Sequence, residues 1–240
     1  MTITQVLIGL NVAAWVLNVV TGVDPLSPSP QDLFAWGASH VLANAEQPWR
    51  LLSSTFLHVG LLHLAVNMQA LWVAGPIADA MLGRWQFLMI YLCAGIFGGL
   101  AAMIGAQPTT VLVGASGAVF GTMGAIAAGV FRHGDRLREE VVASLKRLLW
   151  SFVAINLLIG FLLPGVSNAA HLGGLLSGFG ISCGLAAPGS RPRDTGIRAA
   201  VMLALALALM LGLFRWLTDA DPTHAIGTLG GTNGPVESGG

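Results

Sequence analysis

A serine lies between small residues in the stretch VGASGAVFGTMG. Serine becomes a nucleophile only when a base removes its proton and hydrogen-bond donors stabilise the charge that develops on the attacked carbonyl oxygen. A glycine-flanked serine is weak evidence by itself, because the chain contains 32 glycines and because Gly117 with Gly121 also forms a small-residue packing face. Ser116 is therefore a candidate nucleophile that needs a base and an oxyanion site elsewhere in the chain.

The segment NAAHLGGLLSGFG contains the candidate base, His171. Ala170, Gly174 and Gly178 recur every four residues, and such a stripe lets two helix backbones approach closely. We expect the stripe to pack against the small-residue face that follows Ser116. That packing would bring the Ser116 hydroxyl and the His171 imidazole to the same level along the two helices, where a hydrogen bond can form between them. The alternative role for this histidine is a structural one, with its ring satisfied by packing.

His63 and Asn67 are four residues apart, so on a helix they project from one face about one turn apart. They provide a pair of hydrogen-bond donors suited to an oxyanion. The alternative is that they join helices through hydrogen bonds, as polar side chains in membranes often do.

A metal centre is a poorer interpretation of these residues, because it needs three or four convergent ligands. The candidate ligands among the six histidines are His58, His63 and His171, and Asp79 lies about 24 Å along the same helix from His63. The same distance excludes Asp79 as the third member of a triad. We therefore expect a Ser-His dyad without a metal or other cofactor.

The composition places these residues in a membrane. The chain is 55% hydrophobic and 9% charged, and its mean hydropathy is +0.75. About a quarter of the residues of a soluble domain are charged. The fold class predicted is an all-α polytopic membrane protein, whose partners are the lipid bilayer and other membrane proteins and not nucleic acid.

Long windows without charge give the number of helices, since about 20 apolar residues cross a bilayer. Two of the windows contain central breaks, at residues 106–110 and 164–168, and so hold two spans each. The count is seven helices. The segments that hold them are Ile3 to Val20, Leu51 to Ala78, Trp85 to Phe131, Leu148 to Ser190, and Ala199 to Trp216.

The basic residues predict the orientation. Nine of the eleven Lys and Arg residues follow the even-numbered spans two, four and six, and only Arg50 and Arg215 fall on the other side. By the positive-inside rule the N-terminus is cytoplasmic, and the first turns of the helices that carry Ser116 and His171 lie towards the outside. Residues 1–20 lack a basic n-region, so we interpret them as a retained span and not as a signal peptide.

The connecting segments have fewer signals. About thirty residues after the first span contain turn residues and then scattered apolar ones, and they form either a segment lying in the outer leaflet or an ordinary external loop. The mixed charges of residues 132–147 are typical of a solvated helical hairpin. The composition of residues 219–240 is typical of a flexible tail. Cys93 and Cys183 lie within spans at no suggestive spacing, which predicts neither a disulfide framework nor a metal site.

Taken together and in this order, the motifs resemble those of the rhomboid intramembrane serine proteases. The resemblance extends from Trp36 to Gly184. Its motifs are Trp49-Arg50, His58 with His63-x-x-x-Asn67, Gly114-Ala115-Ser116-Gly117, and Ala170-His171 followed by Gly174 and Gly178.

The resemblance implies a role for each matching residue. It makes Ser116 the nucleophile and His171 the general base and acid. The oxyanion hole it implies comprises His63, Asn67 and the Ser116 backbone N–H. Supporting residues would be His58, Gly114 and Phe120, the last of which corresponds to an aromatic position that packs against the histidine ring.

The resemblance also implies an organisation and a reaction. The six-helix catalytic core would occupy residues 1–187, followed by a cytoplasmic loop and seventh helix at 188–218 and the tail at 219–240. The reaction would be cleavage of transmembrane-segment substrates near the outer side of the bilayer, through an acyl-enzyme and beside a small residue. Asp79 and Phe120 depart from the family pattern, where glutamate and tyrosine are common, but neither is a reacting group. Short loops favour a bacterial inner membrane.

Two other functions fit part of the pattern. A rhomboid-like pseudoprotease would bind membrane helices without cutting them, but it predicts loss of Ser116 or His171, and both are present. A transporter or channel would need polar groups through the whole membrane thickness and an internal repeat. The polar residues here gather towards the outer half instead.

Overall fold

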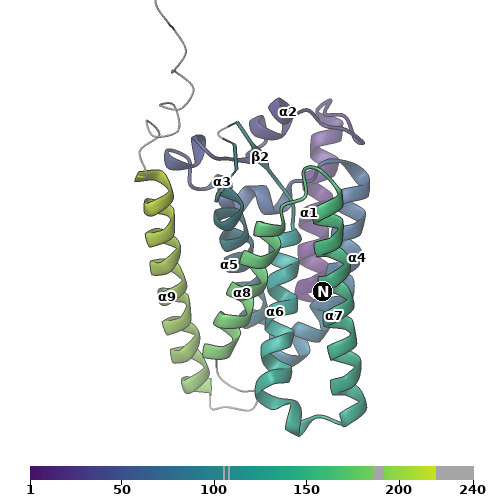
Figure 1. Cartoon of the computed structure of the whole chain (residues 1–240), viewed down its shortest axis with the longest axis vertical. Coiled ribbons are helices and arrows are strands. Elements are labelled where there is room, and N and C mark those ends of the chain that lie inside the picture. The colour runs from purple at the N-terminus through teal and green to yellow at the C-terminus, as the bar shows by residue number, and fades with distance from the viewer. Residues whose placement is uncertain (105, 108, 186–191, 220–240) are drawn as a thin grey trace, which may run out of the picture.

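A computed structural model describes residues 1–104, 106–107, 109–185 and 192–219, and the chain in it is mostly helical (Figure 1). Long helices form one bundle, and short elements lie across its upper end. The elements in chain order are α1 Ile3–Val20, α2 Pro30–Ala35, β1 Ser39–His40, the 3-10 helix η1 Ala43–Ala45, α3 Arg50–Ser53, η2 Ser54–Phe56, α4 Gly60–Leu82, α5 Arg84–Met103, β2 Val111–Leu112, α6 Ser116–His133, η3 Gly134–Arg136, α7 Glu139–Leu162, α8 Asn168–Gly184 and α9 Pro192–Asp219.

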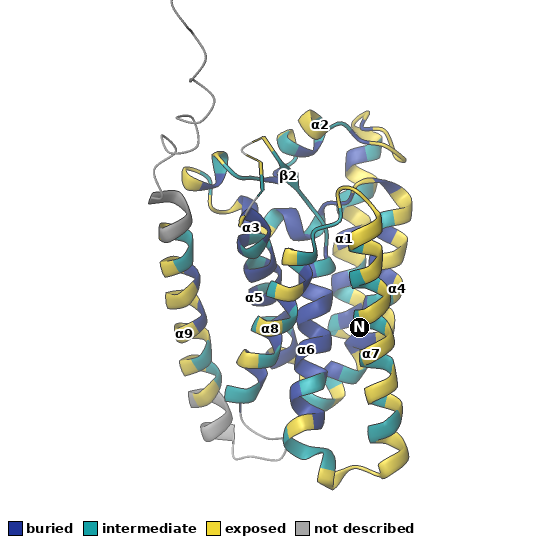
Figure 2. Ribbon diagram, viewed as in Figure 1, coloured by how far each residue is buried: buried dark blue, intermediate teal, exposed yellow. Residues whose placement is uncertain are grey.

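α6 is the central helix of the bundle. Figure 2 shows it buried along most of its length, with α5, α8 and α4 around it and exposed residues on α7 and α9. Its side chains Phe120, Met123 and Ile126 are almost completely buried. Because small residues recur along α6, its neighbours pack close to its backbone.

The long helices agree with the predicted spans at most positions. The first helix has the bounds predicted for it, and α5 and α8 begin within one residue of the predicted starts. A capping box between Thr2 and Gln5 explains the start of α1, since each side chain accepts a hydrogen bond from the other residue's backbone N–H.

The predicted extent of the second span is wrong at its start. The apolar window from residue 51 is interrupted, and α4 begins only at Gly60, whose φ of +83° breaks the helix before it. Ser53, Ser54 and His58 therefore lie in short helices and a turn before α4 and not on the spanning helix.

The charged connection after α6 also differs from the prediction. Residues 132–147 do not form a separate solvated hairpin: α6 continues to His133, η3 makes the turn, and α7 begins at Glu139. The charged residues 139–147 are thus the first turns of α7, where Glu139 and Glu140 lie near the positive end of the helix dipole.

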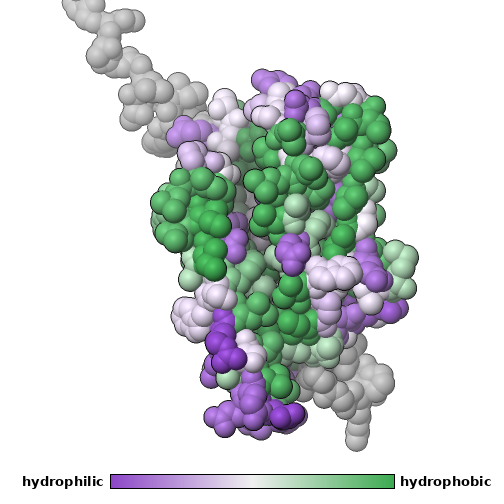
Figure 3. Space-filling model, turned by 90° about the vertical axis from the view of Figure 1, so that its right-hand side faces the viewer, coloured by the Kyte–Doolittle hydropathy of each residue, from purple (hydrophilic) through white to green (hydrophobic). Residues whose placement is uncertain are grey.

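The protein is an integral multi-pass membrane protein by the length and hydropathy of its helices. Five of the helices described are long and apolar enough to cross a membrane, namely α1, α4, α5, α7 and residues 198–215 of α9. Figure 3 shows a face on which apolar side chains cover the middle and hydrophilic ones gather at the lower end. The count of seven spans, which adds α6 and α8, stays a prediction, as does the orientation.

A folded segment, residues 29–53, covers the upper end of the bundle. Ser29 caps α2 by accepting a hydrogen bond from the Asp32 N–H, and the Arg50 guanidinium donates to the carbonyls of Phe34 and Ala38 at 2.7 and 3.1 Å. β1 of this segment pairs antiparallel with β2, with Ser39 opposite Leu112. Residues 29–53 are thereby joined to the chain that leads into α6.

Several sequence predictions fall outside the residues described. They are residue 108 of the predicted break at 106–110, residues 188–191 of the predicted loop-and-helix segment 188–218, and residues 220–240 of the predicted tail.

Candidate active site

The small-residue faces of α6 and α8 meet, as the sequence predicts. A Cβ on Gly174 would collide with the Gly117 carbonyl oxygen, and one on Gly178 would collide with the Gly121 carbonyl oxygen. The two backbones are thus in direct contact over more than one turn. Only glycine permits so close an approach.

Ser116 is the first residue of α6. It is half-buried, and the first backbone N–H groups of a helix have no acceptor within that helix. Both Ser116 and His171 are described, and no hydrogen bond joins their side chains. The Ser-His bond allowed by the sequence is therefore not formed in this conformation.

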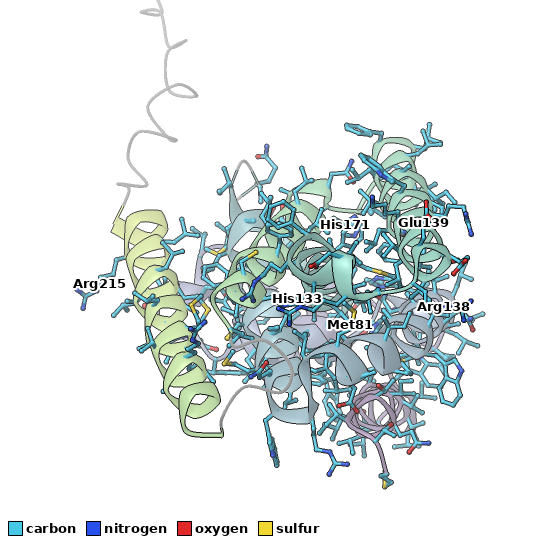
Figure 4. The ribbon with its side chains drawn as sticks, turned by 90° about the horizontal axis from the view of Figure 1, so that it is seen from below. Met81, His133, Arg138, Glu139, His171 and Arg215 are labelled. Carbon is cyan, nitrogen blue, oxygen red and sulfur yellow. The ribbon has the colours of Figure 1, made fainter. Side chains whose placement is uncertain are left out.

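His171 lies in the first turn of α8 and is 5% exposed. Its imidazole stacks on the ring of Phe120, with centroids 4.2 Å apart and planes inclined by 8°. Since Phe120 is one helical turn after Ser116, the stack keeps the imidazole beside the turn that begins with the serine. Figure 4 shows His171 inside the bundle, whereas Arg138 and Glu139 lie towards its edge.

The Nδ1 atom of His171 is buried and has no hydrogen-bond partner among the described residues. In a Ser-His-Asp triad this atom donates to a carboxylate that orients the ring. Here the ring is oriented by aromatic packing, because its face rests on Phe120. The arrangement suits a dyad.

His63 is held with its Nε2 edge towards the chain before Ser116. Its Nδ1 accepts a hydrogen bond of 3.3 Å from the Val59 N–H, so the proton of the neutral ring is on Nε2. A Cβ on Gly114 would lie 2.7 Å from Cε1 and 3.1 Å from Nε2 of His63. Nε2–H is thus a donor beside the segment that enters α6.

Gly114 fits this position for two reasons. Its φ is +131°, a conformation that side-chain-bearing residues rarely adopt, and the ring of His63 fills the space in which a Cβ would stand. The Gly114 N–H donates to the Ser54 carbonyl at 2.9 Å. The entry to α6 is therefore fixed by η2 on one side and by α4 on the other.

Asn67 and His58 complete the predicted set. Asn67 is buried, and one N–H of its amide donates to the His63 carbonyl at 2.9 Å, which leaves the second N–H for another acceptor. The His58 ring meets that of His63 edge to face, with centroids 5.1 Å apart. Neither nitrogen of His58 has a partner among the described residues. His58 therefore supports the position of His63 through its ring.

The sequence did not indicate the part that α7 contributes. Phe152 packs on Phe120 with centroids 4.9 Å apart, so Phe120 lies between Phe152 and His171. An open groove of about 500 Å³ between α4 and α7 is lined by Phe152 of this aromatic pair. Its lining is mainly apolar: Ala65, Val66, Gln69, Ala70, Val73, Met123, Leu148, Phe152 and Asn156.

No group of three or more His, Cys, Asp or Glu residues that could hold a metal ion occurs in the part of the chain that the structure describes.

Comparison with known proteins shows the family to which the chain belongs. The sequence model of the Rhomboid domain matches residues 45–188. The chain is 33% identical over 225 residues to Rhomboid protease GluP of Bacillus subtilis. The matched region covers 93% of this chain and 42% of GluP. It is 36% identical over 156 residues to RHOMBOID-like protein 6, mitochondrial, of Arabidopsis thaliana, covering 64% of this chain and 50% of that protein.

A third relative is similar over a larger share of its own length. Putative rhomboid protease YdcA of Bacillus subtilis is 32% identical over 141 residues, which cover 59% of this chain and 68% of YdcA. The chain spans about half the length of GluP and of the plant relative. The match to the domain extends over more than half of the chain, and the chain belongs to the rhomboid family.

Proposed function

We propose that this chain is an intramembrane serine endopeptidase that uses Ser116 and His171 as a catalytic dyad. The observation that carries the proposal is the stack of His171 on Phe120, which holds an imidazole beside the turn that Ser116 begins. Membership of the rhomboid family and similarity to two relatives named as rhomboid proteases support the same activity.

In the proposed reaction, His171 takes the Ser116 hydroxyl proton while the oxygen attacks the scissile carbonyl carbon. The resulting tetrahedral intermediate collapses to an acyl-enzyme when His171 returns that proton to the leaving amine. Water, deprotonated by the same imidazole, then hydrolyses the ester and restores the serine. A rotation of the Ser116 side chain, or a small displacement of the imidazole, makes the hydrogen bond that this conformation lacks.

Three donors are assigned to the oxyanion. They are the His63 Nε2–H, the free N–H of the Asn67 amide and the Ser116 backbone N–H. The Val59 bond supports the first, because it confines the proton of the neutral ring to Nε2. Donors fixed before the reaction stabilise developing charge without reorganisation.

The substrates proposed are transmembrane segments of single-pass or polytopic membrane proteins, cut near the outer side of the bilayer. A helix hides its carbonyls in hydrogen bonds, so segments that unwind easily near their outer end are favoured. The apolar groove between α4 and α7 supports this class, because it is open and is lined by Phe152, which packs on Phe120.

The proposed setting is the inner membrane of a bacterium, with the N-terminus cytoplasmic and the active site towards the external side. The proposed organisation is a catalytic core at residues 1–187 followed by the loop and seventh helix at 188–218 and the tail at 219–240. The reaction assigned to the dyad requires no cofactor.

Reconstitution with a transmembrane reporter tests the activity. Wild-type protein is expected to cut the reporter, and Ser116→Ala and His171→Ala are expected to abolish cutting. Cleavage that persists in both variants would exclude this dyad. Reporter binding without cleavage by the wild type would favour a pseudoprotease instead.

A further inference from the structure

α7 packs on the bundle less deeply than the other long helices described. None of its residues is buried, and Figure 2 shows exposed and half-buried positions along its length. Near the candidate site, Phe152 packs on Phe120, and Asn168 of α8 bonds to the α7 backbone. The second contact reaches the helix that carries His171.

Asn168 fits closely on the surface of α7. Its Nδ2 donates to the Leu157 carbonyl at 3.2 Å. Its Oδ1 lies over Gly160, where a Cβ would collide with it. This side chain therefore bridges two helices at a point where α7 has no side chain of its own.

Asn168 and His171 belong to the same helical turn. Asn168 is the first residue of α8, and the His171 N–H donates to the carbonyl of the N-cap residue, Ser167, at 3.2 Å. A shift of this turn moves the imidazole relative to Phe120 and Ser116, because both of these lie on α6.

Other contacts hold the rest of α8 and do not involve α7. Gly174 and Gly178 lie against the backbone of α6. At the far end, the Arg132 guanidinium donates to the carbonyls of Ser182 and Leu185 at 3.0 and 2.9 Å. Loss of the bond to α7 thus leaves the α6–α8 pair in place. The turn that carries His171 then loses its link to α7 and keeps its packing on α5 and α6, where the Ala170 carbonyl lies near Gly98 and Gly117.

We propose that Asn168 is a positioning residue, whose hydrogen bond to α7 sets the first turn of α8 and thereby the position of the His171 imidazole relative to Ser116. It does not touch the reacting atoms. The proposal rests on the proposed function, since it assigns a part in the same reaction. It also means that a displacement of α7 changes the geometry of the dyad.

Two readouts separate this role from a structural one. The first is the rate at which a small water-soluble fluorophosphonate labels Ser116, which reports on the dyad without passage of a substrate helix. The second is the kcat and KM for cleavage of the transmembrane reporter. Thermal unfolding of each purified variant measures stability alongside them.

Asn168→Ala is expected to lower the labelling rate and kcat about two- to tenfold, which corresponds to the loss of one hydrogen bond. KM and the unfolding temperature should stay close to those of the wild type. The matched control is Ser177→Ala, because the Ser177 hydroxyl donates within α8 to the Gly174 carbonyl and makes no link to α7. This control should label and cleave like the wild type.

Gly160→Ala disturbs the same contact from the side of α7, so its result does not depend on whether Asn168→Ala folds. The added methyl group should displace the Asn168 side chain and lower the labelling rate and kcat as Asn168→Ala does. In the double variant with Asn168→Ala it should add nothing, because alanine at position 168 leaves room for the methyl group.

Labelling of Asn168→Ala and Gly160→Ala at the wild-type rate overturns the inference, even if reporter cleavage falls, because the bond would then act on substrate passage alone. The inference is also overturned if the losses of the two single variants add up in the double variant. A wild-type protein that is neither labelled nor active would instead contradict the proposed function on which the inference rests.

Discussion

The imidazole of His171 lies parallel to the ring of Phe120, 4.2 Å away between centroids. The two rings belong to helices whose backbones touch at glycines, so the packing of α6 on α8 brings the rings together. Phe152 covers the other side of Phe120. Phe120 has no reactive group of its own, but its ring packs against the imidazole of the candidate base, His171, and so fixes the plane of that imidazole.

Replacing Phe120 by leucine should slow catalysis more than it lowers stability. Aromatic pairs contribute about 0.5–1.5 kcal/mol beyond buried area, so we expect kcat for reporter cleavage to fall about two- to tenfold. Phe120→Tyr keeps the ring and should retain most of the activity. Phe131→Leu is a control on the exposed side of the same helix. Equal kcat values for Phe120→Leu and wild type would contradict the role of the stack.

The contact between α6 and α8 predicts that alanine substitutions at two glycines of α8 have opposite effects on stability. Gly174→Ala drives a methyl group into the Gly117 carbonyl, and overpacking of this kind costs about 1–3 kcal/mol. We expect a lower unfolding temperature and loss of cleavage. Gly180→Ala meets no atom within 4 Å and should be tolerated or slightly stabilising, since alanine is the better helix former. Thermal unfolding in detergent compares the two, and equal effects would exclude this packing.

Much of this site follows from the sequence because its residues lie on helices with regular spacing. The glycine repeats after Ser116 and His171 predict which faces meet, since small residues at four-residue intervals mark close helix contacts. The first turns of α6 and α8 are likewise predicted, because the breaks before them are visible as turn residues.

Other features depend on contacts that no local pattern encodes. The window that contains His58 carries no charge, so the break at Gly60 is hidden among apolar residues. β1 and β2 have two residues each, too few to show an alternating pattern. The link from Asn168 to Leu157 arises only once α7 and α8 lie side by side.

Arg50 should stabilise the folded segment at residues 29–53 through the fixed geometry of its guanidinium. Its guanidinium is buried, bonds to the Phe34 and Ala38 carbonyls and lies 3.9 Å from the centroid of the Phe34 ring. Lysine keeps the charge but not the planar fork. We expect Arg50→Lys to cost about 1.5–3 kcal/mol, measured by thermal unfolding, and to speed proteolytic nicking within residues 30–45. The surface variant Arg136→Lys is the control, and identical nicking rates would contradict this role.

The tautomer of His63 gives the last prediction. The Val59 N–H is the donor that keeps the ring proton on Nε2, and the φ of Val59, −80°, lies within the range of proline. Val59→Pro therefore removes this one donor, whereas Val59→Ala keeps it. Loss of a whole oxyanion donor costs about 100- to 1000-fold in kcat, which is the effect expected of His63→Ala. The kcat of Val59→Pro should lie between that of His63→Ala and that of the wild type, because the proton of the His63 ring is then shared between its two nitrogens. If Val59→Pro and Val59→Ala cut the reporter equally fast, the backbone bond does not set the tautomer that the reaction uses.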